Sequence, residues 1–155
     1  MALRRALGQF LKRHCIVAAD TMVFIYHLQE HPRYIPATQV ILDAWEAGSH
    51  QGVTSILTLA EVLVRPLRDG NEKAVEDYRR LLTTFPNLRL IEVGRGVVEL
   101  AARLRATHGL PMPDMIQAAT ALTAGATGFI SNDAGFKRVK DLDILLLDEV
   151  APARR

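Results

Sequence analysis

The sequence predicts an α/β fold built on one central parallel sheet of five short strands, with helices on both faces of the sheet. Short, continuously apolar segments alternate along the chain with segments whose apolar residues recur at helical spacing. Strands that are apolar on both sides are typical of a parallel sheet buried between two helix layers. The 155 residues suit one compact domain, and a hydrophobic content of 49% supplies its core.

The first 14 residues are predicted to form a basic amphipathic helix or extension ahead of the main domain. Leu3, Leu7, Phe10 and Leu11 fall on one side of such a helix, and the basic residues lie mostly off that side. We expect this helix to dock on the domain or on a second subunit. A membrane-surface helix and a transit peptide are the alternatives, because basic amphipathic segments serve in both.

The segments that follow alternate between strands and helices. Residues 15–19 are continuously apolar, as expected of a strand covered on both faces, and we expect Cys15 to be buried with them. Proline and glycine residues mark the helix ends. Strands are predicted over 15–19, 52–55, 88–93, 127–131 and 143–147, and helices over 22–29, 38–47, 58–67, 72–84, 97–107 and 114–124. Together they make one domain over 15–150, followed by a basic tail over 151–155.

Composition excludes several classes of protein. Charged residues make up 23% of the chain, and the counts of glycine and proline are ordinary, which excludes disordered, collagen-like and coiled-coil proteins. One cysteine cannot form an internal disulfide, so we expect a reducing, cytoplasmic location. No apolar segment approaches the roughly 20 residues that span a bilayer. The first 15 residues contain four basic residues and no acid, so the rest of the chain is net acidic although the whole carries +2.

Two aspartates lie just beyond the ends of predicted strands. Asp20 comes after residues 15–19, and Asp133 comes after Phe129-Ile130-Ser131-Asn132. Parallel α/β sheets bind ligands beyond the carboxyl ends of their strands, so the two carboxylates are predicted to share one crevice if their strands are neighbours. The alternative is that each aspartate only caps the helix that follows it.

Two further acids lie in apolar surroundings. Glu61 is the only charge within Leu57-Thr58-Leu59-Ala60-Glu61-Val62-Leu63-Val64, where a buried carboxylate is costly unless it is paired or binds a cation. Its alternative is a capping box, for which Thr58 and Glu61 have the spacing. Asp114 stands at the start of a helix, where the dipole alone favours an acid.

A divalent cation would explain all four acids together. Carboxylates that converge in a crevice repel one another, and a hard cation with oxygen ligands relieves that repulsion. Mg²⁺ or Mn²⁺ held in this way, with positions open to water and phosphate, is the apparatus of metal-assisted phosphodiester hydrolysis. No Cys/His cluster offers a softer site.

The segments IVAADTMVFIY, TLAEVL, LPMPDMIQAATAL and GFISNDAGFKRV resemble the PIN domain, in particular the VapC-like toxin ribonucleases. The resemblance implies a three-layer fold with strand order 3-2-1-4-5 and a metal-dependent endoribonuclease. It implies that Asp20, Glu61, Asp114 and Asp133 are catalytic and gather one or two Mg²⁺ or Mn²⁺ ions, supported by Thr21, Ser131 and Asn132. It also implies a homodimer, an RNA substrate and a cognate antitoxin, although stand-alone PIN ribonucleases exist.

The sequence departs from the family pattern in two places, and the first leaves a second hypothesis open. Met22 stands where the family usually has Asn or Ser, and the basic N-terminal extension is unusual. A PIN-fold binding module with weak or lost nuclease activity is therefore the alternative. If RNA is bound, the candidate contacts to its backbone are Arg4, Arg5, Lys12, Lys137 and Arg138.

A zinc peptidase is a weaker alternative. His27-Leu28-Gln29-Glu30-His31 matches the H-x-x-E-H pattern, in which two histidines on one helix face bind zinc. Pro32 follows at once, however, and the sequence shows no convincing third ligand. We therefore expect His27, Glu30 and His31 to have no catalytic role.

Overall fold

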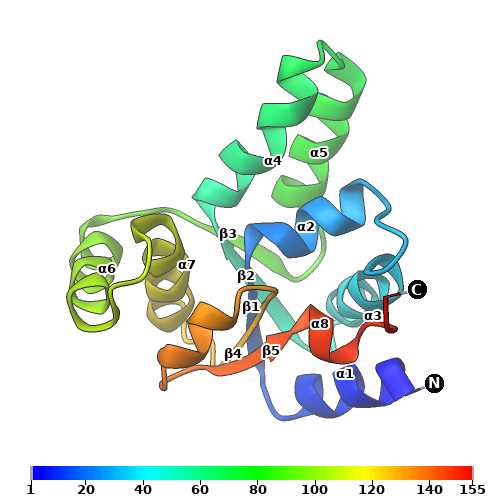
Figure 1. The fold of residues 1–155 in the computed structure, drawn as a ribbon. Coiled ribbons are helices and arrows are strands. Elements are labelled where there is room, and N and C mark those ends of the chain that lie inside the picture. The colour runs from blue at the N-terminus through cyan, green and yellow to red at the C-terminus, as the bar shows by residue number, and fades with distance from the viewer. Residues whose placement is uncertain (1, 155) are drawn as a thin grey trace.

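The computed structural model describes residues 2–154 and contains one five-stranded sheet (Figure 1). All pairings are parallel, and the strand order is β3-β2-β1-β4-β5. The predicted fold class and strand order are therefore confirmed. The strands are β1 (Ile16–Ala19), β2 (Gln51–Ser55), β3 (Leu88–Ile91), β4 (Gly128–Ser131) and β5 (Asp143–Leu146).

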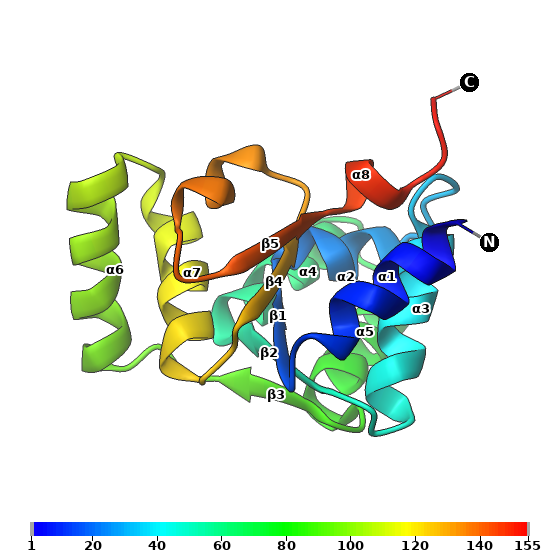
Figure 2. The same ribbon diagram turned by 90° about the horizontal axis from the view of Figure 1, so that it is seen from below.

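Helices cover both faces of the sheet and make a three-layer molecule (Figure 2). Successive residues of β1 point to opposite faces, so Val17 and Ala19 enter one core while Ala18 enters the other. The first core is covered by α1 (Ala2–Lys12), α2 (Thr21–Leu28), α3 (Ile35–Glu46), α4 (Ile56–Arg68) and α5 (Glu72–Thr84). The second is covered by α6 (Arg95–His108), α7 (Met112–Thr123) and the 3₁₀ helix η1 (Ala134–Arg138), and the short α8 (Leu147–Val150) follows β5.

The N-terminal helix packs on the domain through its apolar side. Leu7, Phe10 and Leu11 of α1 are buried in the first core, and α1 contacts α3 and α8. At its end, the buried imidazole of His14 bonds the Asp143 carboxylate at 2.7 Å and the Thr127 hydroxyl at 2.7 Å. The helix is thereby tied to the amino ends of β4 and β5. No helix within residues 2–154 is long and apolar enough to cross a membrane.

The structure differs from the expected elements at several bounds, in two short helices and at Cys15. Pro36 and Pro113 lie in the first turns of α3 and α7, where proline is tolerated, so both helices begin before the predicted positions. The short helices η1 and α8 were not predicted. Cys15 is exposed just before β1 and not buried as expected.

Candidate metal and active site

Asp20 occupies the carboxyl end of β1, the central strand of the sheet. Its Oδ1 accepts a hydrogen bond from the Thr21 backbone N–H at 2.7 Å, which makes it the N-cap of α2, and its Oδ2 accepts from the Ser131 hydroxyl at 2.9 Å. Burial raises the pKa of Asp20, and repulsion by Glu61 and Asp133 adds to the rise, while the bonds from Ser131 and Thr21 oppose it. The aspartate is therefore both a helix cap and a member of an acidic group.

Ser131 links Asp20 to the acid of the neighbouring strand. Its hydroxyl is fully buried at the end of β4, donates to Asp20 and accepts from the Asp133 backbone N–H at 3.1 Å. The exposed Asp133 carboxylate accepts from the Gly135 backbone N–H at 2.8 Å and caps η1. The adjacency of β1 and β4 thus brings the two aspartates to one edge of the sheet, as their positions after strands predicted.

Asp114 approaches the same edge from the first turn of α7. Its carboxyl is half-buried, and no side-chain cap bond is made at the start of this helix. Burial raises the pKa of Asp114 to about 6, and repulsion by Asp20 and Asp133 contributes to the rise. The helix dipole favours the ionised form, but burial, together with repulsion by the neighbouring carboxylates, outweighs it.

Glu61 completes the acidic group from α4, although not in the way its sequence context suggested. The side chain is exposed, because it lies on the solvent side of α4 while Val62 faces the core. The helix begins after Ser55, which caps it through the Leu57 backbone N–H at 3.2 Å, so Thr58 and Glu61 do not form a capping box. The Thr21 hydroxyl donates to Glu61 Oε1 at 3.3 Å and holds the carboxylate toward Asp20.

A cluster of buried hydroxyl and amide groups lies beneath these acids. Of its members, only Thr21 was predicted to belong to the site. The residues Thr21, Thr54, Thr58 and Gln117 have exposed fractions of 2%, 1%, 0% and 3%. They come from α2, β2, α4 and α7 and bond one another at 2.7–3.2 Å. The only signal in the sequence is that these polar residues stand at positions that otherwise face the core.

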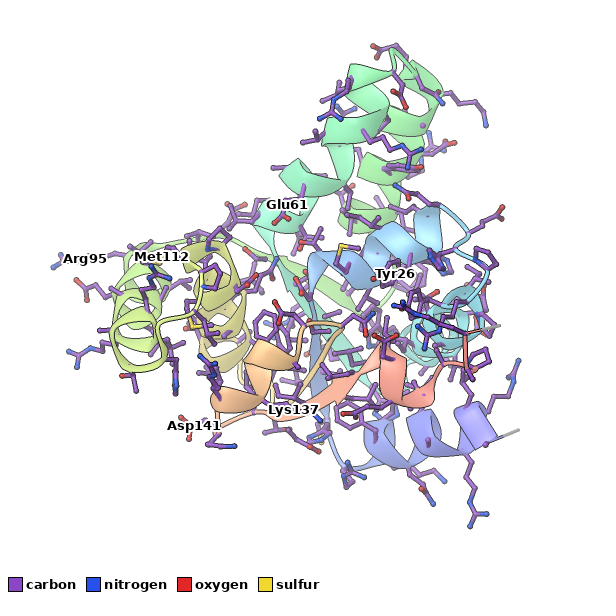
Figure 3. The ribbon with its side chains drawn as sticks, viewed as in Figure 1. Tyr26, Glu61, Arg95, Met112, Lys137 and Asp141 are labelled. Carbon is purple, nitrogen blue, oxygen red and sulfur yellow. The ribbon has the colours of Figure 1, made fainter. Side chains whose placement is uncertain are left out.

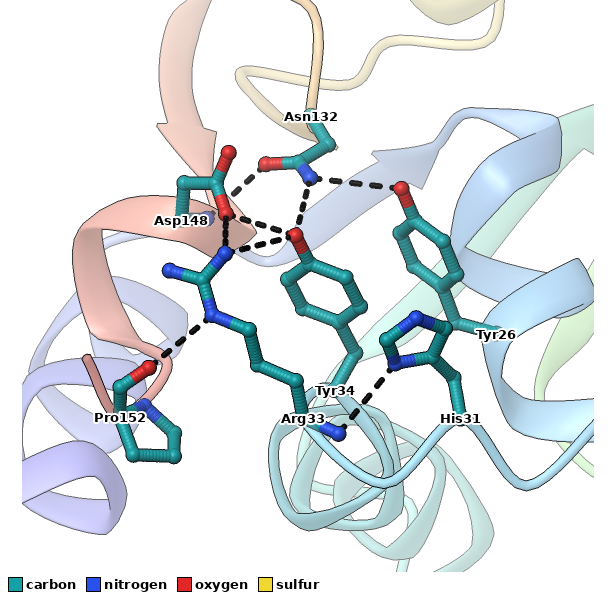
Figure 4. A network of polar contacts seen from close by, with 7 residues as sticks. All are labelled: Tyr26, His31, Arg33, Tyr34, Asn132, Asp148 and Pro152. Carbon is teal, nitrogen blue, oxygen red and sulfur yellow. Dashed lines mark hydrogen bonds and ion pairs between the residues drawn. The ribbon is translucent and has the colours of Figure 1, made fainter. Parts of the chain in front are cut away.

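Asn132 belongs to a network of aromatic and charged residues (Figure 4). Its amide nitrogen donates to the hydroxyls of Tyr34 at 3.1 Å and Tyr26 at 3.4 Å, and its oxygen accepts from the Asp148 backbone N–H at 2.9 Å. Arg33 pairs with the Asp148 carboxylate at 2.6 Å. The amide therefore fastens the end of β4 to α2, to the start of α3 and to α8.

The basic candidates for RNA contact are scattered over the molecule. Lys137 is paired with Glu149 and lies well away from Glu61 (Figure 3). Arg138 donates to the carbonyl of His108, the last residue of α6, at 3.3 Å. Exposed Arg4, Arg5 and Lys12 all lie on α1.

The histidines of the H-x-x-E-H segment do not form a zinc site. Helix α2 ends at Leu28, and Glu30 has a positive φ of 49°, so the segment does not continue as a helix. His27 bonds the Thr38 hydroxyl at 3.1 Å, whereas His31 accepts from the Arg33 backbone N–H at 3.2 Å. The two imidazoles thus have separate partners.

The acidic group suits a hard cation better than a soft one. Within residues 2–154 no three His, Cys, Asp or Glu side chains are grouped closely enough to form a ready-made metal cage. Mg²⁺ commonly needs only one or two protein carboxylates, because water and substrate phosphates fill its other positions. Asp20 and Asp114, whose pKa values are raised partly by other carboxylates, are the side chains a cation would relieve.

Comparison with known proteins agrees with this geometry. The family model described as the PIN domain matches residues 17–142, which include all four acids. The chain belongs to the PIN domain family. No curated protein matches it significantly.

Solved structures share the PIN fold at low sequence identity. VapBC2 from Rickettsia felis, bound to a DNA fragment from its promoter, is 17% identical with a TM-score of 0.68, over 84% of this chain and 98% of that chain. A toxin-antitoxin complex from Klebsiella pneumoniae is 21% identical with a TM-score of 0.65, over 82% and 95%. VapBC-1 from nontypeable Haemophilus influenzae is 23% identical with a TM-score of 0.61, over 86% and 98%.

Proposed function

We propose that this PIN domain is a metal-dependent endoribonuclease that hydrolyses RNA phosphodiester bonds, acting as the toxin of a toxin-antitoxin pair or as a stand-alone ribonuclease. The observation that carries the proposal is the gathering of Asp20, Glu61, Asp114 and Asp133 at one edge of the sheet. Four elements that are distant in the sequence supply these carboxylates, and two of them have pKa values raised in part by mutual repulsion. Such an arrangement is costly without a cation and useful with one.

In this proposal Asp20, Asp114 and Asp133 hold Mg²⁺ or Mn²⁺, directly or through water. Glu61 ligates a second ion or orients the attacking water. The bound cation supplies a water of lowered pKa and neutralises charge that develops on the phosphate oxygens. Ser131 and Thr21 orient Asp20 and Glu61 through the hydrogen bonds that they donate.

The partners in the proposal follow from the family and from what its solved relatives are. One of those structures is a toxin-antitoxin complex and two are VapBC proteins, so we include a cognate antitoxin. The homodimer is taken from the resemblance to VapC-like toxins, and the cytoplasmic location from the single cysteine. RNA rather than DNA is taken from the resemblance to VapC-like ribonucleases, because nothing in the acidic site itself selects a 2′-hydroxyl.

Cleavage of labelled RNA by the purified protein tests the proposal, with Mn²⁺, with EDTA and with the Asp114→Asn variant in parallel. We expect cutting with Mn²⁺, none with EDTA, and a loss of at least a hundredfold in the variant, because a neutral amide holds a divalent cation far less well. Asp141→Asn is the matched control, since Asp141 is exposed and outside the acidic group, and it should cut normally. Absence of both cutting and Mn²⁺ binding would instead favour a binding module, the hypothesis that Met22 left open.

A further inference from the structure

The buried hydroxyl cluster beneath the acids has a fixed direction of hydrogen bonding. Thr54 Oγ1 lies 2.9 Å from the Ala19 carbonyl, which can only accept, so the Thr54 proton is used there. Thr54 must therefore accept from Thr58 Oγ1 across the 2.7 Å contact. The Thr58 proton is thereby used as well, and this hydroxyl can only accept any further bond.

Gln117 supplies the donors that Thr58 then needs. Its Nε2 lies 2.9 Å from Thr58 Oγ1 and 3.2 Å from Thr21 Oγ1, and the two amide hydrogens serve one hydroxyl each. Thr21 consequently receives a bond from Gln117 and retains its own proton for another acceptor.

The Thr21 proton has two possible acceptors. One is Thr58 Oγ1 at 3.1 Å, and the other is Glu61 Oε1 at 3.3 Å. Because Gln117 already donates to Thr58, the buried hydroxyl has a partner without Thr21. A carboxylate is also the stronger acceptor, with bonds roughly twice as strong as those between neutral groups. The proton therefore goes to Glu61.

We propose that Gln117 is a positioning residue, which directs the Thr21 hydroxyl proton onto Glu61 and so holds this otherwise exposed carboxylate toward Asp20. The inference rests on the proposed function for its consequence, since the placed carboxylate serves the cation site. Without Gln117, the fully buried Thr58 oxygen keeps its bond to Thr54 but loses the donor to its lone pairs, and the Thr21 hydroxyl at 3.1 Å takes over as that donor. Glu61 then loses its bond to Thr21, and its side chain samples several rotamers in solvent.

A double-mutant cycle separates positioning from a merely structural role. Gln117→Met keeps the side-chain length and removes both donors, and Gln39→Met is the matched control at an exposed position of α3. We expect Gln117→Met to raise the Mn²⁺ dissociation constant about tenfold by calorimetry, in the range found for residues that orient metal ligands. In the Glu61→Gln background, Gln117→Met should change the Mn²⁺ dissociation constant less than twofold. Equal losses in both backgrounds, or no loss in either, overturn the inference.

Crystal structures of the metal-free protein and of Gln117→Met give a readout that does not depend on nuclease activity. We expect Thr21 and Thr58 to draw together in the variant and Glu61 to leave Thr21. A Glu61 carboxylate that stays on Thr21 in the variant overturns the inference even if RNA is cut. A wild-type protein that neither binds Mn²⁺ nor cuts RNA overturns the proposed function, and these two structures then still decide the role of Gln117.

Discussion

Asp114 shows the cost of burying a carboxylate beside other acids without a cation. Its folded pKa of about 6 lies above the ordinary value of 3.8, so the folded chain holds the proton more tightly than the unfolded chain. Stability therefore falls as pH rises through that interval, and the whole penalty is present above it. Two pKa units correspond to about 3 kcal/mol, which solvent screening of this half-exposed group reduces to about 1 kcal/mol.

Asp114→Asn should accordingly stabilise the metal-free protein at pH 7. We expect a gain of about 1 kcal/mol, or about 2–4 °C in the melting temperature, because the amide has no charge to desolvate on burial and none to repel Asp20 and Asp133. At pH 4 the gain should vanish, since the wild-type carboxyl is then largely protonated. Thermal melts in EDTA at both pH values measure this. Asp141→Asn should change stability by less than 0.5 kcal/mol at either pH, and a destabilised Asp114→Asn at pH 7 would contradict the argument.

The sequence predicted the positions of the acids better than their surroundings. Asp20 and Asp133 follow apolar strands. Because ligands bind beyond the carboxyl ends of parallel strands, this position was enough to predict that the two carboxylates lie close together. The exposure of Glu61 could not be foreseen, because an apolar helix that projects from the body leaves part of its apolar surface in solvent. Val64 and Leu67 of α4 are 50% and 55% exposed for the same reason. The buried cluster around Gln117 was also not predicted, because its members come from different elements and no local sequence pattern joins them.

Among the elements, strands and long helices were predicted closely and short helices were missed. The limits of α5 are those expected, because Asn71 caps its start and Phe85 leaves helical geometry at its end. The short helices η1 and α8 are too brief to show helical periodicity. Their ends are fixed by tertiary partners, such as the bond from the Asp148 backbone to Asn132.

The packing of α3 on β2 depends on one glycine. A Cβ atom at Gly52 would lie 2.5 Å from Cε2 of Trp45, whose ring is fully buried and has no room to retreat. Gly52→Ala should therefore destabilise the protein by about 3 kcal/mol, at the upper end of the usual overpacking cost. Urea unfolding followed by Trp45 fluorescence measures the loss.

Gly8→Ala provides the matched control for this prediction. Nothing lies within 4 Å of a Cβ atom at Gly8 in the middle of α1, so alanine should stabilise by about 0.5–1 kcal/mol through its helix propensity. Equal effects of the two substitutions would show that the contact with Trp45 does not limit the packing of α3.

Across the whole molecule, positive charge is distributed unevenly relative to the acidic site. The basic residues of α1 lie on a helix that packs on α3 and α8, whereas the four acids lie on or beside β1, α4, α7 and β4. Lys137 is neutralised by Glu149. Arg138 differs from these, because its contact with the His108 carbonyl places its guanidinium beside the loop that enters α7. Among the five basic candidates, we therefore expect Arg138 to contribute most to RNA binding.

Arg138→Gln should weaken RNA binding about three- to tenfold at low salt. It should also reduce the slope of log affinity against log salt by about 0.7, because one phosphate contact on a single strand is lost. Arg5→Gln, on α1, is the matched control and should leave both quantities nearly unchanged. Fluorescence anisotropy with a catalytically inactive Asp114→Asn background measures binding without cleavage. If Arg5→Gln weakens binding and Arg138→Gln does not, RNA reaches the acids across α1, and the N-terminal helix rather than η1 carries the positive contact.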